Sequence, residues 1–192
     1  RPPRSTLFPY TTLFRSLTKS VVNSTGIVQA TSLSNKGGKI VLEGDVITLS
    51  SDAALDASGA TGGGTVHVGG GWQGAGDLRQ AETVTMQSGA SIKANATDVG
   101  HGGEVVLWSD ITNADSLTTV AGSIEAKGGQ AGGDGGRVET SGRTLDINDA
   151  TVSTVAPAGN TGDWLLDPGH ITIVSGSGGA VAGTGNIGAT TV

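Results

Sequence analysis

The chain repeats one short stretch, His101-Gly102-Gly103-Glu104-Val105-Val106-Leu107-Trp108-Ser109 in its fullest copy. The shared pattern is a pair of glycines, one polar residue and then alternating apolar residues. Further copies stand at Gly37–Leu42, Gly63–Val68, Gly135–Thr140 and, more weakly, Gly162–Leu166. The second glycines fall at 38, 64, 103 and 136, and Gly162 extends the series in steps of 26, 39, 33 and 26 residues. Periods of this length are typical of solenoid repeats.

A shorter element precedes each glycine pair at nearly constant spacing. Its copies are Ile27-Val28-Gln29-Ala30, Leu55-Asp56-Ala57-Ser58, Ile92-Lys93-Ala94, Ile124-Glu125-Ala126 and Val152-Ser153-Thr154. Each copy contains an alanine or threonine at an equivalent position, and these residues are Ala30, Ala57, Ala94, Ala126 and Thr154. They precede Gly38, Gly64, Gly103, Gly136 and Gly162 by 8, 7, 9, 10 and 8 residues. This constancy indicates that each repeat is one structural unit.

Each repeat holds three short segments with the two-residue period of a β-strand. In the first full repeat they are Ile27–Ala30, Lys39–Glu43 and Val46–Leu49, and Leu17–Asn23 is interpreted as an incomplete first turn. Glycine is expected at the corners because it adopts a positive φ at little cost. No segment shows helical spacing over three turns with a cap, so we expect no long helix.

Three strands per turn, wound in one direction, predict an all-β chain folded as a parallel β-helix of about five turns, with neighbouring turns about 4.8 Å apart. Two inward columns follow, Ile40, Val66, Val105, Val138, Trp164 and Leu42, Val68, Leu107, Thr140, Leu166. The residues after the glycine pairs should face outward, and they are Lys39, Thr65, Glu104, Arg137 and Asp163. The last three alternate in charge, which favours this register.

The repeat region is predicted to span residues 17–174, with its extra residues in loops at Gly69–Asp77 and Asp110–Asp115. Ile171–Val174 is expected to form one more strand. Residues 175–192 are rich in Gly, Ala and Thr without periodicity, and we interpret them as a linker or the start of another module.

Residues 1–16 differ in composition from everything after them. They hold both phenylalanines, the one tyrosine and three of the five prolines, but no glycine and no acid. The segment is similar to a translated sequencing adapter, so we interpret it as a non-native scar and exclude it from fold reasoning. The alternative is a basic native arm, and comparison of the underlying DNA with the adapter distinguishes the two.

Composition and charge exclude several classes of protein. The formal net charge is −6, and without the first sixteen residues 8 basic residues face 17 acidic ones. An acidic chain argues against nucleic acid and against anionic membranes as partners. No run of 18 apolar residues is present, so no membrane insertion is expected. Cysteine is absent, which excludes disulfides and suits a chain exported unfolded.

Two motifs suggest ligands but lack the necessary context. Gly69-Gly70-Gly71-Trp72-Gln73-Gly74 matches a dinucleotide-binding fingerprint, yet no helix follows it. Gly132-Gly133-Asp134-Gly135-Gly136 resembles one unit of a calcium-binding repeat, which requires tandem copies. His67, His101 and His170 are too far apart in sequence to form a metal motif, and His67 should point outward. We therefore predict no metal and no cofactor.

One enzymatic alternative is a polysaccharide-cleaving β-helix, with Glu104, Arg137, Glu139 and Asp163 as its candidate residues. We interpret these four residues as a solvated charge ladder and predict no catalytic residues. Asn23 and Asn95 begin N-glycosylation tripeptides. Trp72 and Trp108 would stack on sugar if exposed, although shielding of a glycine-rich turn is the preferred interpretation.

Several blocks together resemble a known family. Leu-Asp-Ala-Ser-Gly (55–59), Val-Gly-Gly-Gly-Trp-Gln-Gly (68–74), Ala-Lys-Gly-Gly (126–129), Gly-Asp-Trp-Leu-Leu-Asp-Pro (162–168) and the stretch at 100–110 are similar to filamentous haemagglutinin-like exoproteins of two-partner secretion systems. The resemblance covers roughly residues 20–174. The family's N-terminal secretion domain is not recognisable here, so the segment resembles the rod downstream of that domain.

The resemblance implies a right-handed β-helical rod, exported through an outer-membrane β-barrel transporter that recognises the missing N-terminal domain. It also implies a location outside the cell or on the surface of a Gram-negative bacterium. We accordingly predict a non-enzymatic shaft segment of an adhesin, with an unknown ligand on a host or bacterial surface. The alternatives are the polysaccharide-cleaving enzyme and the stalk of a contact-dependent toxin.

Overall fold

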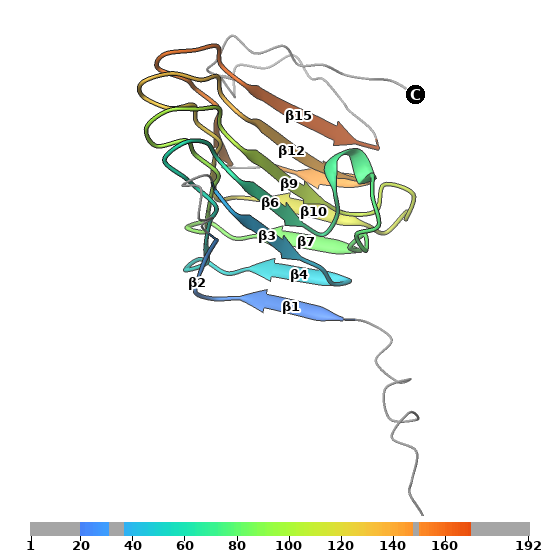
Figure 1. Ribbon diagram of the computed structural model, residues 1–192. Helices are drawn as coiled ribbons and strands as arrows, with labels where there is room; N and C mark the ends of the chain where they lie inside the picture. Colours follow the sequence, from blue (N-terminus) through green and yellow to red (C-terminus); the bar gives the residue numbers. More distant parts are fainter. Residues whose placement is uncertain (1–19, 31–36, 148–149, 170–192) are drawn as a thin grey trace, which may run out of the picture.

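The computed structural model describes residues 20–30, 37–147 and 150–169, and these form a stack of five similar turns (Figure 1). Each turn contributes one strand to each of three parallel five-stranded sheets. Sheet 1 contains β1 (Val21–Ser24), β4 (Val46–Leu49), β7 (Thr83–Met86), β10 (Leu117–Val120) and β13 (Thr144–Asp146). Sheet 2 contains β2 (Ile27–Gln29), β5 (Ala54–Asp56), β8 (Ser91–Lys93), β11 (Ser123–Glu125) and β14 (Thr151–Ser153). Sheet 3 contains β3 (Lys39–Leu42), β6 (Thr65–Val68), β9 (Glu104–Trp108), β12 (Arg137–Gly142) and β15 (Asp163–Pro168).

This architecture confirms the predicted all-β parallel β-helix of about five turns. Each strand pairs with the strand three places later in the chain, so the backbone hydrogen bonds between strands run along the stack. The described helical structure is a single short 3-10 segment, η2 (Trp72–Gly74). Among the described residues, no helix is long and apolar enough to cross a membrane.

The register of sheet 3 matches the predicted columns throughout. Val105 pairs with Val66 and Val138, and the column continues to Ile40 and Trp164 at its ends. The second column is aligned in the same way over Leu42, Val68, Leu107, Thr140 and Leu166. The predicted outward column, from Lys39 through Glu104 to Asp163, is aligned as well.

The core is a column of small aliphatic side chains rather than a cluster of aromatic rings. In sheet 2, Leu55, Ile92 and Ile124 stack on one another and are at most 1% exposed. Complete burial of a valine, leucine or isoleucine side chain contributes about 1.5–3 kcal/mol before the entropy of ordering is counted. Stability therefore accumulates turn by turn along the axis.

One hydrogen bond at the corner between sheets 2 and 3 explains the near-constant spacing found in the sequence. In every turn, the N–H of the second glycine donates to the carbonyl of the alanine or threonine that ends the preceding element. The bonds are Gly38 to Ala30 (2.9 Å), Gly64 to Ala57 (2.8 Å), Gly103 to Ala94 (2.7 Å), Gly136 to Ala126 (2.7 Å) and Gly162 to Thr154 (2.9 Å). Loops of different length are thus closed by the same contact.

The paired glycines are required for a reason other than the predicted positive φ, which none of them adopts. A Cβ atom on Gly103 would lie 2.0 Å from the carbonyl oxygen of Gly64 in the neighbouring turn. On Gly64, Gly136 and Gly162, it would lie 2.1, 2.0 and 1.8 Å from the matching oxygens of Gly38, Gly103 and Gly136. The turns approach so closely at this corner that no side chain fits between them.

Both predicted loops lie beside the stack, between sheets 3 and 1. Residues 69–80, which include η2, connect β6 to β7, and residues 110–115 lie between β9 and β10. The expected scar at 1–16, the strand at 171–174, the segment 175–192 and His170 all lie outside the described residues. The boundaries of the repeat region and the identity of the two ends therefore stay predictions.

Replacement of Gly103 by alanine tests the close approach at the corner. Because the added methyl group would meet backbone atoms that cannot move independently, we expect a loss of about 3 kcal/mol or more in the free energy of unfolding. Urea denaturation followed by circular dichroism measures it. Gly26→Ala is the matched control, since a Cβ on Gly26 meets nothing within 4 Å, and it should change stability by less than about 0.5 kcal/mol. Equal losses in both variants would contradict the steric explanation.

Candidate functional site: the strapped outer face of sheet 3

The outer face of sheet 3 carries histidine, glutamate, arginine and tryptophan side chains close to one another. Residues 69–80 leave the end of β6 and return across this face, and we call them the strap (Figure 1). Several residues that point outward are buried, notably Trp108 (1% exposed), His67 (9%) and Glu139 (0%). His67 points outward as predicted, but it is buried rather than hydrated, because the strap and Glu104 cover it.

Trp108 provides the apolar contact beneath the strap. A Cβ on Gly70 or Gly74 would lie 2.5 or 2.6 Å from its indole ring, so only glycine permits the strap to pass this closely. The indole Nε1–H donates to Gln80 Oε1 at 3.1 Å, which satisfies its one polar atom. The preferred interpretation of this tryptophan, that it shields a glycine-rich turn, is thus confirmed.

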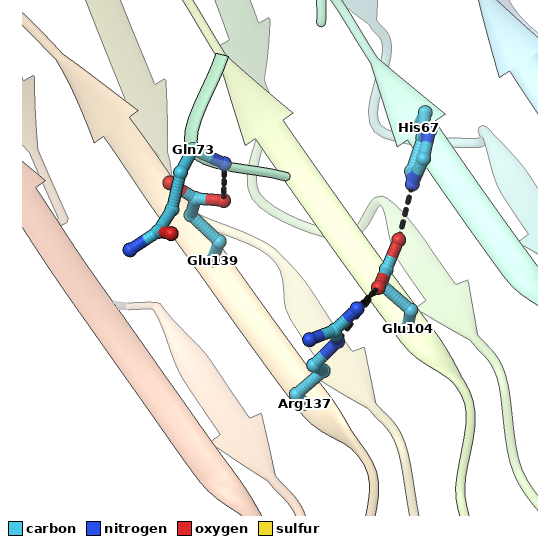
Figure 2. A network of polar contacts seen from close by, with 5 residues as sticks. All are labelled: His67, Gln73, Glu104, Arg137 and Glu139. Atoms are coloured by element: carbon cyan, nitrogen blue, oxygen red, sulfur yellow. Dashed lines mark hydrogen bonds and ion pairs between the residues drawn. The ribbon is translucent and has the colours of Figure 1, made fainter. Parts of the chain in front are cut away.

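A line of ionisable groups crosses three neighbouring strands of this face (Figure 2). His67 Nε2 lies 2.6 Å from Glu104 Oε1, and Arg137 Nε donates to Glu104 Oε2 at 2.6 Å. The hydrogen bond from His67, together with Arg137, lowers the pKa of Glu104 despite partial burial. The guanidinium of Arg137 also lies 4.3 Å from the ring centre of Trp72, so it links the sheet to the strap.

Glu139 is the second polar anchor of the strap. Its Oε2 accepts the backbone N–H of Gln73 at 2.7 Å (Figure 2). Its Oε1 accepts the Ser141 hydroxyl at 2.8 Å. Gln73 has a φ of 52°, an unfavourable value for a residue other than glycine. Burial raises the pKa of Glu139, and the nearby carboxylates of Asp167 and Glu104 raise it further.

The structure brings together three of the four candidate residues of the enzymatic alternative and separates the fourth. Glu104, Arg137 and Asp163 are neighbours in the outward column, whereas Glu139 lies in the adjacent column under the strap. The interpretation of all four as a solvated ladder is wrong for Glu139, which is fully buried. Glu104 and Arg137 bond to each other, so the two groups are committed to the internal structure of this face.

The segment 132–136, which resembles one unit of a calcium-binding repeat, is held by hydrogen bonds within its corner. Asp134 Oδ1 accepts the backbone N–H of Asn160 at 2.8 Å, and the Asp134 N–H donates to His101 Nδ1 at 2.9 Å. Within the described ranges, no group of three His, Cys, Asp or Glu side chains is close enough to hold a metal ion. The predictions of no catalytic, metal or cofactor site stay predictions.

The Asn95 side chain, in one of the two glycosylation tripeptides, links neighbouring turns. Its Nδ2 donates to Glu125 Oε2 at 2.9 Å, and its Oδ1 accepts the Lys127 N–H at 2.8 Å. Both ends of the amide are therefore engaged in the folded chain. Asn23, in the other tripeptide, is exposed on β1.

The raised pKa of Glu139 predicts a specific dependence of stability on pH. The folded state holds this proton more tightly than the unfolded state, so Glu139 stabilises the fold in acid. Its contribution is lost as the pH rises from the ordinary carboxyl value of 4.5 through the raised value. Relative to Glu139→Gln, which cannot ionise, the wild-type chain should lose free energy of unfolding across this range. Urea denaturation at a series of pH values measures the difference.

Glu125→Gln is a control for which the opposite dependence of stability on pH is expected. Burial acts to raise the pKa of Glu125, but hydrogen bonds from Lys127 and Asn95 outweigh it and lower the value. The stabilisation from Glu125 should therefore be present above the ordinary carboxyl value and be lost as the pH falls through the lowered one. Parallel curves for wild type and Glu139→Gln would show that the strap carboxyl does not titrate as described.

Comparison with known proteins finds similarity to solved structures. No protein-family model matches the sequence, and no curated protein matches it. Among solved structures, the HMW1 secretion domain from Haemophilus influenzae matches with a TM-score of 0.57 and 29% sequence identity. The match covers 77% of this chain and 38% of the HMW1 chain, so this chain spans well under half of that structure. The resemblance predicted from the glycine-paired motifs is thereby confirmed: the chain is similar to a TpsA-type exoprotein of a two-partner secretion system.

Proposed function

We propose that this chain is a segment of the β-helical shaft of a secreted or surface-displayed bacterial adhesin of the filamentous haemagglutinin type. The observation that carries the proposal is the register: all three sheets continue through five turns without interruption. Each turn adds about 4.8 Å of length along the axis. A shaft of this kind holds binding regions away from the cell and offers repeated weak contacts along its sides.

Two carboxylates of the outer face already have hydrogen-bond partners within the fold, which supports a structural rather than an enzymatic role. Glu104 bonds to His67 and Arg137, and Glu139 bonds to the strap, so both carboxylates are occupied. The similarity to a secretion domain supports export and an outer-membrane β-barrel transporter as partner. The matched structure is a secretion domain, so a position within such a domain is the alternative to the proposed position in the rod downstream. The complete open reading frame distinguishes these two positions.

Folding outside the cell would help to draw the chain outward, because each new turn can stack on the one before it. Absence of cysteine is consistent with export in an unfolded state. Val105 and Leu107 are both fully buried in the inward columns of β9. Aspartate at these two positions would place unpaired charges in the core and block the stacking.

The double variant Val105→Asp/Leu107→Asp should therefore be secreted less than the wild type when expressed in the complete gene with its transporter. The loss of stability should exceed about 4 kcal/mol, and immunoblots of medium and cell fractions measure the secreted share. The matched control is Thr144→Asp/Thr151→Asp, which places two aspartates at exposed strand positions and should be secreted normally. Equal secretion of both variants would refute the proposed link between folding and export.

The alternative functions give different results in simple assays. A shaft gives a β-rich circular dichroism spectrum and leaves polysaccharides intact. A polysaccharide-cleaving enzyme releases unsaturated sugars, which are detected by ultraviolet absorbance. The stalk of a contact-dependent toxin is followed by a toxin domain in the complete gene.

A further inference from the structure

A cavity lies on the outer face of sheet 3, between the strap and the strands β3 and β6. Its walls include Lys39, Glu43, His67, Trp72, Asp77 and Glu104, and the rest of its lining comes from small and apolar residues of the strap. Its volume of about 490 Å³ lies within the range of small-molecule sites. The side chains that anchor the strap leave this space open.

Trp72 supplies the aromatic part of the cavity lining, and Leu78 also lines the cavity. Arg137 holds this ring at 4.3 Å from its guanidinium, and Gln73, the next residue, is bonded to Glu139. The ring is thus positioned from the sheet side before any ligand arrives. A preorganised aromatic surface reduces the entropic cost of binding.

The polar wall combines one donor with several acceptors. Among the described residues, neither the Lys39 ammonium nor the Asp77 carboxylate forms a hydrogen bond or an ion pair. Glu43 uses Oε1 to accept the Arg79 N–H at 2.9 Å, so its Oε2 is available. An ammonium donor and two carboxylate acceptors therefore line the same cavity as the indole.

We propose that this cavity binds an uncharged pyranose sugar. The apolar face of a pyranose ring packs on an indole, and its hydroxyl groups both donate to carboxylates and accept from an ammonium group. Glu104 is neutralised by its ion pair with Arg137, and the two other carboxylates of the lining, Glu43 and Asp77, outnumber the one lysine, so an anionic sugar is disfavoured. The sugar site is independent of the shaft role: either one can fail while the other stands.

The test is a titration of the full chain by NMR, which follows the indole Nε1–H signals of its three tryptophans. The probes are the methyl glycosides of glucose, mannose and galactose, together with N-acetylglucosamine and, as an anionic comparison, N-acetylneuraminic acid. We expect at least one neutral sugar to shift the Trp72 signal saturably, with a roughly millimolar Kd. The Trp108 signal should move little, because that ring is buried.

Three variants separate the site from general effects. Trp72→Ala should abolish saturable binding, monitored by saturation-transfer signals of the sugar. Lys39→Ala and Asp77→Asn, which leave the strap contacts intact, should each weaken binding by about threefold or more. Lys93→Ala is the matched control, since Lys93 is exposed on β8 in sheet 2, and it should bind like the wild type.

Three outcomes would overturn the proposal. The first is the absence of a saturable shift with every neutral sugar. The second is equal affinity in Lys39→Ala, Asp77→Asn and Lys93→Ala, which would locate the binding elsewhere. The third is tighter binding of N-acetylneuraminic acid than of any neutral sugar, which would contradict the charge argument.

Discussion

The structure depends on a close approach between backbones at one corner. The paired glycines bring each turn so near to its neighbour that a Cβ on Gly103 or Gly162 would lie 2.0 or 1.8 Å from a carbonyl oxygen. The same residues supply the N–H groups that close every turn on Ala30, Ala57, Ala94, Ala126 or Thr154. One contact thus fixes both the shape of a turn and its distance from the next. The inward columns then follow, because equal turns place equivalent residues above one another.

Variation in repeat length leaves this corner unchanged. The longest step, from Gly64 to Gly103, contains the strap, and the following step contains the loop at 110–115. Both insertions leave the stack between sheets 3 and 1, whereas the corner between sheets 2 and 3 keeps its hydrogen bond in every turn. Inserted residues can therefore acquire new contacts without a cost to the axial hydrogen bonds, as is general for solenoids.

Sequence patterns predicted the fold well because the information is local and repeated. The columns through Val105 and Leu107 follow from the period of two and from the alignment of glycine pairs, and the structure reproduces both. The strap was not predictable in the same way. It occurs once, so no period reveals where it lies, and alternation marks His67 and Glu139 as outward but not as covered. The one available signal was Trp72 within a run of glycines, a composition that permits close packing against a sheet.

The strap changes the chemistry that a solenoid surface can support. On an open sheet, Glu104, Arg137 and Glu139 would be hydrated, and their interactions would contribute little. Under the strap, Glu139 bonds only to neutral donors and its pKa is raised, whereas Glu104 is paired and its pKa is lowered. The pKa values of two carboxylates on adjacent columns thus shift in opposite directions, because the hydrogen bonds from His67 and Arg137 dominate at Glu104 and burial dominates at Glu139. A single long loop therefore gives one part of the repetitive sheet 3 a chemical environment that the other turns lack.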